Sequence, residues 1–187
     1  GEIIMIFVSM LFGWGSPLMP IQLLWVNLIT DSLPAFALGL EGKEDDVMNV
    51  PPRDPDMPIV DKQMRIGIIF QSIALAAAAL ISYRYGYSID PKLANTFAFI
   101  TLISGELLRA FSGRSETKSL FKIGLLGNKY LNISVLVCYG LTALLLFIPF
   151  LRNIFEIHLI TGSQLLIAFI ISLIPFVGGE ISKFIKK

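Results

Sequence analysis

The apolar residues of this chain fall into long runs that are separated by polar, proline-containing or basic stretches. Runs of this length are typical of membrane-spanning helices, because a helix needs about 20 mostly apolar residues to cross the hydrocarbon core of a bilayer. The pattern therefore predicts an all-α fold, a polytopic transmembrane helix bundle of six segments. The predicted segments cover approximately residues 1–13, 21–40, 66–83, 93–111, 131–150 and 162–177.

The stretches between the segments predict how the chain is oriented in the membrane. Most of the Lys and Arg residues lie in the loops 41–65 and 112–130 and in the C-terminal tail, whereas the opposite turns hold few. Cytoplasmic loops carry such an excess of basic residues, so we place these two loops and the tail on the cytoplasmic side. We expect the proline-rich stretch 50–59 to be extended and to dock against a cytoplasmic domain of a longer protein.

Composition agrees with a membrane protein and narrows the possible partners. The 187 residues are 55% hydrophobic with a mean hydropathy of +0.73. A net charge of +1 argues against binding to nucleic acid, and the single cysteine, Cys138, excludes an internal disulfide. The first apolar run is short and follows neither an initiator Met nor a basic signal-peptide region. We therefore expect the chain to be the C-terminal part of a larger protein.

The segment 21–40 carries one carboxylate, Asp31, near its centre. A charged side chain at that depth costs about 2.5–3.5 kcal/mol on the insertion scale, so intramembrane acids mark functional sites by default. In a regular α-helix Asn27, Thr30 and Asp31 would share one face. Pro34 should loosen the helix around residues 30–34 and free backbone carbonyls. Such a cluster of hard oxygens suits Ca²⁺ or, less specifically, Na⁺ or Mn²⁺; the alternative is a hydrogen-bonded structural acid.

A second intramembrane acid, Glu106, stands one helical turn before Arg109 in the segment 93–111. Two interpretations remain open. In the first, the two residues form a mutually neutralising pair near the cytoplasmic end, with Arg109 extended toward the interface. In the second, Glu106 is an ion ligand. The polar residues Gln71 and Ser72, in the segment 66–83, are interpreted as hydrogen-bonding groups between helices.

Residues 23–39, with the sequence LLWVNLITDSLPAFALG, resemble the sixth membrane helix of P-type cation ATPases of the calcium-pump class. The flanking sequences agree. Gly1-Glu2 is similar to the end of an Asn-x-x-Glu stretch in the fifth helix, and PPRDPDMPI to the proline-rich loop after the sixth. KSLFKIGLLGNKYLN is similar to the connection between the eighth and ninth helices. The resemblance covers essentially the whole chain and implies that its six segments are the fifth to tenth helices of such a pump.

The resemblance also implies ion ligands. Asp31 resembles the carboxylate that two calcium sites share, Thr30 and Glu2 resemble ligands of one site, and Asn27 resembles a ligand of the other. Glu106 resembles the eighth-helix ligand of the first site.

Arg109 departs from the animal pumps, which have a neutral residue at that position. A guanidinium is effectively always charged, so near Glu106 it would repel a divalent cation and favour one transported calcium per cycle. If Arg109 instead extends to the interface, both sites can fill.

The resemblance implies a division of labour in a longer enzyme. These residues contain no DKTGT phosphorylation motif and no nucleotide or actuator domain, so this chain alone should not hydrolyse ATP. Ca²⁺ is the expected transported ion, and ATP and Mg²⁺ belong to the full-length parent. The expected partners are the lipid bilayer, the N-terminal helices and the cytoplasmic domains of the same pump. The expected location of this multi-pass protein is the plasma membrane in a bacterium and otherwise an intracellular membrane.

Two rival functions use the same residues. A small stand-alone secondary transporter would use Asp31 as a proton or sodium site; such folds often show internal repeats, and we find none here. A purely structural membrane module would only dock the rest of a pump.

Overall fold

The computed structural model describes residues 1–42, 58, 60, 62–115 and 118–185, and within these ranges all regular secondary structure is helical. The predicted all-α fold is therefore confirmed. Apart from Pro58, the proline-rich stretch 50–59 lies outside the described residues, so its expected docking stays a prediction.

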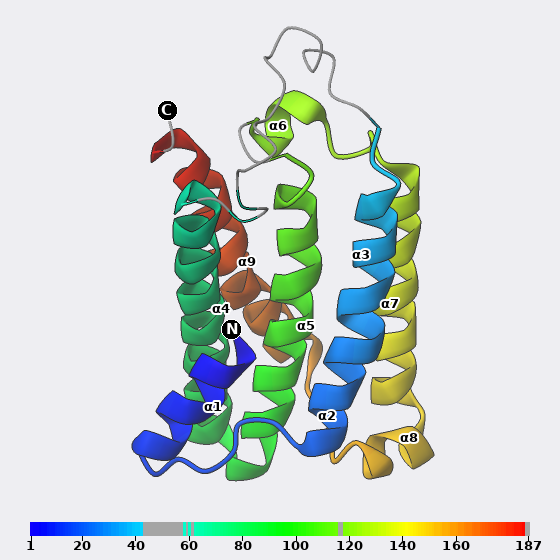
Figure 1. Ribbon diagram of the computed structural model, residues 1–187. Coiled ribbons are helices and arrows are strands. Elements are labelled where there is room, and N and C mark those ends of the chain that lie inside the picture. The colour runs from blue at the N-terminus through cyan, green and yellow to red at the C-terminus, as the bar shows by residue number, and fades with distance from the viewer. Residues whose placement is uncertain (43–57, 59, 61, 116–117, 186–187) are drawn as a thin grey trace, which may run out of the picture.

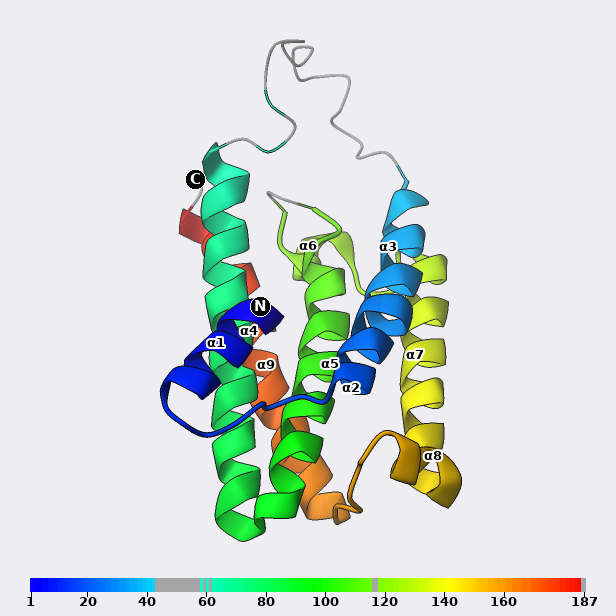
Figure 2. The ribbon, with the colours of Figure 1, turned by 60° about the horizontal axis from the view of Figure 1, so that its bottom comes forward.

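Residues 1–39 form an inclined helix and a composite helix (Figure 1). Helix α1 (Glu2–Leu11) begins at mid-height of the bundle and packs against α4. After a turn, α2 (Pro20–Trp25), the π-helical η1 (Val26–Asp31) and α3 (Ser32–Gly39) follow one another as a single rod. This rod packs along α7, as the turned view also shows (Figure 2).

Three long helices, α4, α5 and α9, form the most closely packed part of the bundle. Helix α4 (Lys62–Ile89) is followed by the 3₁₀ turn η3 (Pro91–Leu93), which leads into α5 (Ala94–Ser112). Helix α5 lies centrally, and most of its side chains are buried. Gly105 shows how tight the packing is, because a Cβ there would lie 2.8 Å from a methyl carbon of Leu75 and 3.2 Å from Cγ of Pro175.

The rest of the chain alternates between short and long helices. Helix α6 (Leu120–Ile123) lies within the predicted loop 112–130, and α7 (Lys129–Phe147) follows it. Pro149 begins the separate helix α8 (Pro149–Ile154) instead of closing the segment before it. The last helix, α9, runs from Gly162 to Ile185 and so continues well beyond the predicted end at residue 177. Helix α4 likewise continues to Ile89, beyond the predicted end at residue 83.

Four stretches of helix within the described residues are long and apolar enough to cross a membrane: Pro20–Gly39, Met64–Ile89, Lys129–Phe147 and Gly162–Lys183. Helix α1 is shorter, and α5 is not among the four although its length would suffice. Because α5 is enclosed by other helices and exposes little surface, it can carry polar residues that a lipid-facing helix cannot. The count of six membrane segments therefore stays a prediction.

The ends of the helices agree with the predicted alternation of loops. The C-terminal end of α3, the start of α4, helix α6 and the end of α9 lie at one end of the bundle, at the top of Figure 1. The α1–α2 turn, η3 and α8 lie at the opposite end. The described parts of the basic loops thus share one end, which is the predicted cytoplasmic end.

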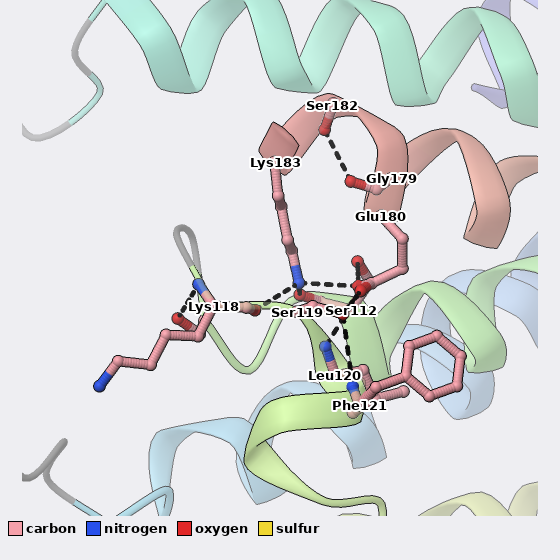
Figure 3. Close-up of polar contacts among 10 residues, drawn as sticks. Ser112, Lys118, Ser119, Leu120, Phe121, Gly179, Glu180, Ser182 and Lys183 are labelled. Atoms are coloured by element: carbon pink, nitrogen blue, oxygen red, sulfur yellow. Dashed lines mark hydrogen bonds and ion pairs between the residues drawn. The ribbon is translucent and has the colours of Figure 1, made fainter. Parts of the chain in front are cut away.

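Glu180 and Lys183 fasten α9 to the ends of α5 and α6 at that end (Figure 3). The carboxylate of Glu180 accepts hydrogen bonds from Ser112 Oγ at 2.7 Å, Ser119 Oγ at 2.8 Å and the Leu120 amide at 3.0 Å. Lys183 Nζ lies 2.8 Å from the same carboxylate and donates to the Ser112 carbonyl at 2.7 Å. From the sequence, Glu180 and Lys183 were placed in a tail after the last membrane segment. In the structure both lie within α9, where each has several buried hydrogen-bond partners.

A second polar cluster, at the same end, joins α3 to α7. Arg114 contacts both carboxylate oxygens of Glu41, with its Nη2 2.9 Å from Oε1. Asn128 donates to Glu41 Oε2 at 2.6 Å and to the Ala37 carbonyl at 2.9 Å, while its own Oδ1 accepts from the Leu131 amide and so caps α7. The last carbonyls and the first amides of a helix lack intrahelical partners. The side chain of Asn128 therefore supplies a donor to the C-terminal end of α3 and an acceptor to the N-terminal end of α7.

Candidate ion-binding site

The composite rod contains a widened turn beside its carboxylate. The π-helical segment η1 runs from Val26 to Asp31, a little earlier than the predicted loosening at residues 30–34. Pro34 lacks an N–H, so the carbonyl of Thr30 loses its usual helical partner, and the chain relaxes on the N-terminal side of the proline. Single π-turns inside helices occur frequently at functional sites.

Some of the carbonyls in the widened turn have found other donors. Ser32 Oγ donates to the Asn27 carbonyl at 3.2 Å, and Cys138 Sγ donates to the Ile29 carbonyl at 3.5 Å. Both carbonyls precede residues 30–34, so the prediction that carbonyls are freed there stays a prediction. Cys138 is fully buried.

Thr30 and Asp31 face a cavity of about 300 Å³ between the composite rod, α4 and α5. Pro34 lines it from the same rod, and Glu106 and Arg109 line it from α5. The remaining lining residues are Ala35, Leu38, Gln71, Ala110 and Gly113. The structure thus brings together five of the site residues predicted from the sequence, namely Thr30, Asp31, Pro34, Glu106 and Arg109.

Asp31 and Glu106, here called the carboxyl pair, line the same cavity from two neighbouring elements, the composite rod and α5. Asp31 is exposed, whereas Glu106 is only 7% exposed and its Oε2 has no hydrogen-bond partner. Two ionised carboxylates in one cavity repel each other, and a cation between them relieves that repulsion. The pair is therefore the chemically unsatisfied centre of the cavity.

The hydroxyl of Thr30 adds a further oxygen to this centre. Thr30 is 2% exposed, and its Oγ1 is buried without a hydrogen-bond partner. A buried polar group without a partner costs about 1–3 kcal/mol. Thr30 and Glu106 both line the cavity, and each has a buried oxygen without a hydrogen-bond partner. Hydroxyl and carboxylate oxygens are the kind of ligand that a hard cation prefers.

Asn27 and Glu2 meet one another outside the lining of this cavity. Asn27 Nδ2 donates to Glu2 Oε2 at 3.3 Å and to the Leu23 carbonyl at 2.9 Å. Asn27 is exposed and does not line the cavity, whereas Thr30 is buried and does. The structure therefore separates Asn27 from Thr30, which the α-helical spacing had placed together, because η1 is wider than an α-helix.

The acids have not converged on one three-carboxylate centre. Among the described residues, no group of three or more His, Cys, Asp or Glu side chains is placed to hold a metal ion. Glu2 interacts electrostatically with Asp31, and its Oε1 is buried without a partner, but it does not line the cavity.

Arg109 is half-buried in the wall of the same cavity. Within the described part of the chain it forms no salt bridge with Glu106, so the neutralising pair considered from the sequence is not formed. Arg109 does interact electrostatically with Asp31 and with Glu106. Its charge therefore acts on the carboxyl pair across the cavity.

Gln71 is the residue whose place the sequence did not reveal. It was interpreted as a hydrogen-bonding group between helices, but it lines the cavity from α4. The available signal was a polar side chain inside an otherwise apolar run. That signal is ambiguous, because such residues also serve simply to join helices.

The comparisons with known proteins agree on one family. Residues 15–185 match the family described as "Cation transporting ATPase, C-terminus". "Calcium-transporting ATPase 1" of Bacillus cereus is 37% identical over 205 residues, covering 100% of this chain and 23% of that protein. "Calcium-transporting ATPase 1" of Lactococcus lactis is 37% identical, with 100% and 21% covered, and "Calcium-transporting ATPase lmo0841" of Listeria monocytogenes is 38% identical, with 84% and 18% covered. The chain spans less than a quarter of the length of these relatives.

Proposed function

Because the chain belongs to the family of cation-transporting ATPase C-terminal domains, we propose that it is part of the membrane domain of an ATP-driven calcium pump. Relatives that match over the whole chain are named calcium-transporting ATPases. In this proposal residues 1–187 supply the fifth to tenth membrane helices, and the rest of a longer protein supplies phosphorylation, ATP and Mg²⁺. The bilayer and those other parts of the same pump are its partners.

The observation that carries the proposal is one cavity lined by the carboxyl pair of Asp31 and Glu106 and by Thr30, whose hydroxyl has no hydrogen-bond partner. Ca²⁺ takes six to eight oxygen ligands and tolerates irregular geometry. A cavity lined by carboxylate and hydroxyl oxygens from two packed helices fits that demand. A secondary transporter using Asp31 is not favoured, because the matching relatives are ATPases.

The other predicted ligands form the neighbouring part of the proposed site. In this proposal Asp31 is the carboxylate that the two calcium sites share. Asn27 and Glu2 bind the cation on the exposed side of Asp31, and Pro34 keeps the helical turn at Asp31 open. Binding can drive phosphorylation only if the ion has different affinities for the two global states of the pump. The widened helical turn next to Asp31 is an element whose conformation can differ between those two states.

Asp31→Asn in the full-length pump tests the proposal. The substitution removes one charge from a hard-cation site, so calcium-dependent phosphorylation by ATP should be lost, with at least a hundredfold fall in apparent calcium affinity. The matched control is Asp90→Asn, because Asp90 caps η3 at the opposite end of the bundle and should not affect calcium activation. Normal calcium activation of Asp31→Asn would show that Asp31 is structural and would refute the proposal.

Arg109 bears on the number of ions, and we propose one calcium per cycle. A permanent positive charge in the cavity wall lowers the affinity for a second divalent cation. Equilibrium ⁴⁵Ca²⁺ binding to the intact pump, divided by the number of phosphorylation sites, should give about one, and Arg109→Asn should raise it toward two. A ratio of two with Arg109 in place would contradict the proposal.

A further inference from the structure

Gln71 of α4 lies in the wall that two cavities share. It lines the cavity of about 300 Å³ that contains Asp31 and Glu106, and it also lines a smaller cavity of about 120 Å³. The smaller cavity extends toward the predicted cytoplasmic end, where Ser182 and Lys183 border it. Gln71 is thus the polar side chain of α4 at the junction between the carboxyl pair and the end of the bundle.

The amide of Gln71 packs against the backbone of Gly179 in α9. A Cβ on Gly179 would lie 3.3 Å from Gln71 Nε2 and 3.7 Å from its Cδ, so the amide fits there because residue 179 has no side chain. No described residue hydrogen-bonds to this amide. The terminal torsion of glutamine is broad, so a rotation brings the carbonyl oxygen to either side of the amide plane.

An oxygen from α4 would add a neutral ligand to those from the composite rod and α5. Asp31 and Thr30 approach from the composite rod and Glu106 from α5, and of the described lining residues only Gln71 is a neutral amide. Carbonyl oxygens of Asn and Gln are regular ligands of Ca²⁺. A neutral oxygen adds a ligand without adding a charge opposite Arg109 or between the two carboxylates.

We propose that Gln71 is a further ion ligand, whose amide oxygen binds the divalent cation held by Asp31 and Glu106. This inference rests on the proposed function, because it needs a cation in that cavity. Three helices that enclose the cavity then contribute oxygens: the composite rod, α5 and α4. Residue 71 would lie opposite the carboxyl pair and set the fit of the ion between them.

Three variants of the full-length pump test the inference. Gln71→Leu keeps a similar volume without the oxygen and should weaken equilibrium ⁴⁵Ca²⁺ binding and the calcium dependence of phosphorylation about tenfold. Gln71→Glu restores an oxygen and should bind calcium at least as well as the unaltered pump. Ser72→Ala, the neighbouring polar position on α4 but outside the cavity, should change neither measurement.

The outcomes separate this inference from the proposed function. If Asp31→Asn abolishes calcium binding while Gln71→Leu binds like Ser72→Ala, Gln71 is not a ligand and only the inference fails. If Asp31→Asn binds calcium normally, the proposed function fails as well. Equal losses in Gln71→Leu and Gln71→Glu, with lower thermal stability in detergent, would show a packing role and overturn the inference. Should Gln71→Leu fail to fold, Gln71→Met, which is unbranched and flexible, takes its place with the same expected loss.

Discussion

Two buried glutamates on neighbouring helices have opposite surroundings. Glu180 on α9 is 6% exposed and Glu106 on α5 is 7% exposed, so both are withdrawn from water to the same extent. Glu180 accepts hydrogen bonds on both oxygens and lies 2.8 Å from Lys183 Nζ (Figure 3). Glu106 has an oxygen with no hydrogen-bond partner, and a second carboxyl group, that of Asp31, lines the same cavity.

The difference shows that burial alone does not identify a functional acid. The desolvation of Glu180 is offset within the fold by a lysine and several donors, which is how a structural ion pair is stabilised. Glu106 forms no salt bridge with any described residue, and one of its oxygens has no hydrogen-bond partner, although Arg109 lines the same cavity. A ligand that supplies the missing positive charge therefore gains more at Glu106 than at Glu180.

The largest expected effect separates the two glutamates directly. Glu180→Gln leaves Lys183 buried without its counter-charge and should destabilise the protein by about 3–5 kcal/mol. Glu106→Gln removes a charge that repels Asp31 and should leave stability unchanged or higher, while apparent calcium affinity falls at least tenfold. Both variants are made in the full-length pump. Thermal unfolding in detergent checks the expected stabilities, and ⁴⁵Ca²⁺ binding checks the expected calcium affinities.

A control tests whether the loss at Glu180 comes from the unpaired lysine. Glu180→Gln combined with Lys183→Met removes both charges and should recover part of the lost stability, since an apolar replacement of a buried ion pair is often neutral. Weakened calcium binding in folded Glu180→Gln, or a large loss of stability in Glu106→Gln, would abolish the distinction between the two sites.

An intermediate effect is expected at Glu41, a third carboxylate that is satisfied within the fold. The hydrogen bonds from Arg114 hold the pKa of Glu41 below its ordinary value, against the opposing effect of partial burial. A lowered pKa contributes stability that is fully present above the ordinary value, about 4.3 for Glu, and is lost as the pH falls through the lowered pKa. Thermal unfolding should therefore show a loss of stability as the pH drops below about 4.3.

Glu41→Gln should remove that part of the pH dependence. At neutral pH it should cost about 1.5 kcal/mol, at the low end for hydrogen bonds to charged groups because Glu41 is partly exposed. Glu156→Gln, at an exposed position at the other end of the bundle, is the matched control and should keep the full acid sensitivity. An unchanged acid response in Glu41→Gln would mean that the contacts with Arg114 and Asn128 add little stability.

The smallest expected effect concerns the unpartnered hydroxyl of Thr30. Thr30→Val is nearly isosteric and removes a buried oxygen that makes no hydrogen bond, so stability should stay the same or rise by about 1 kcal/mol. Apparent calcium affinity should fall by roughly fivefold to tenfold, because one neutral ligand is lost. Thr142→Val is the control, since that hydroxyl already donates to the Cys138 carbonyl at 2.8 Å. A loss of stability in Thr30→Val with unchanged calcium affinity would assign Thr30 to the structure alone.

The sequence by itself determined the helical class of this protein and the chemistry in its helices. The apolar runs predicted an all-helical protein, because the length and hydropathy of a run are local properties. Asp31, Glu106 and Arg109 stood out because a charge inside an apolar run is costly wherever the helix packs. Pro34 likewise predicted a disturbed helical turn, since the missing N–H of a proline affects the residues just before that proline.

Only the tertiary structure decided which of these groups meet. The common cavity of Asp31 and Glu106, the hydrogen bond from Asn27 to Glu2 and the place of Gln71 depend on the rotation and register of whole helices. Close approaches such as that of Gly105 to Leu75 and Pro175 set that register. The pairing of Glu180 with Lys183 and Ser112 has the same origin. Hydropathy records that a side chain is polar, but whether its charge is satisfied depends on donors and acceptors that the fold brings from distant parts of the chain.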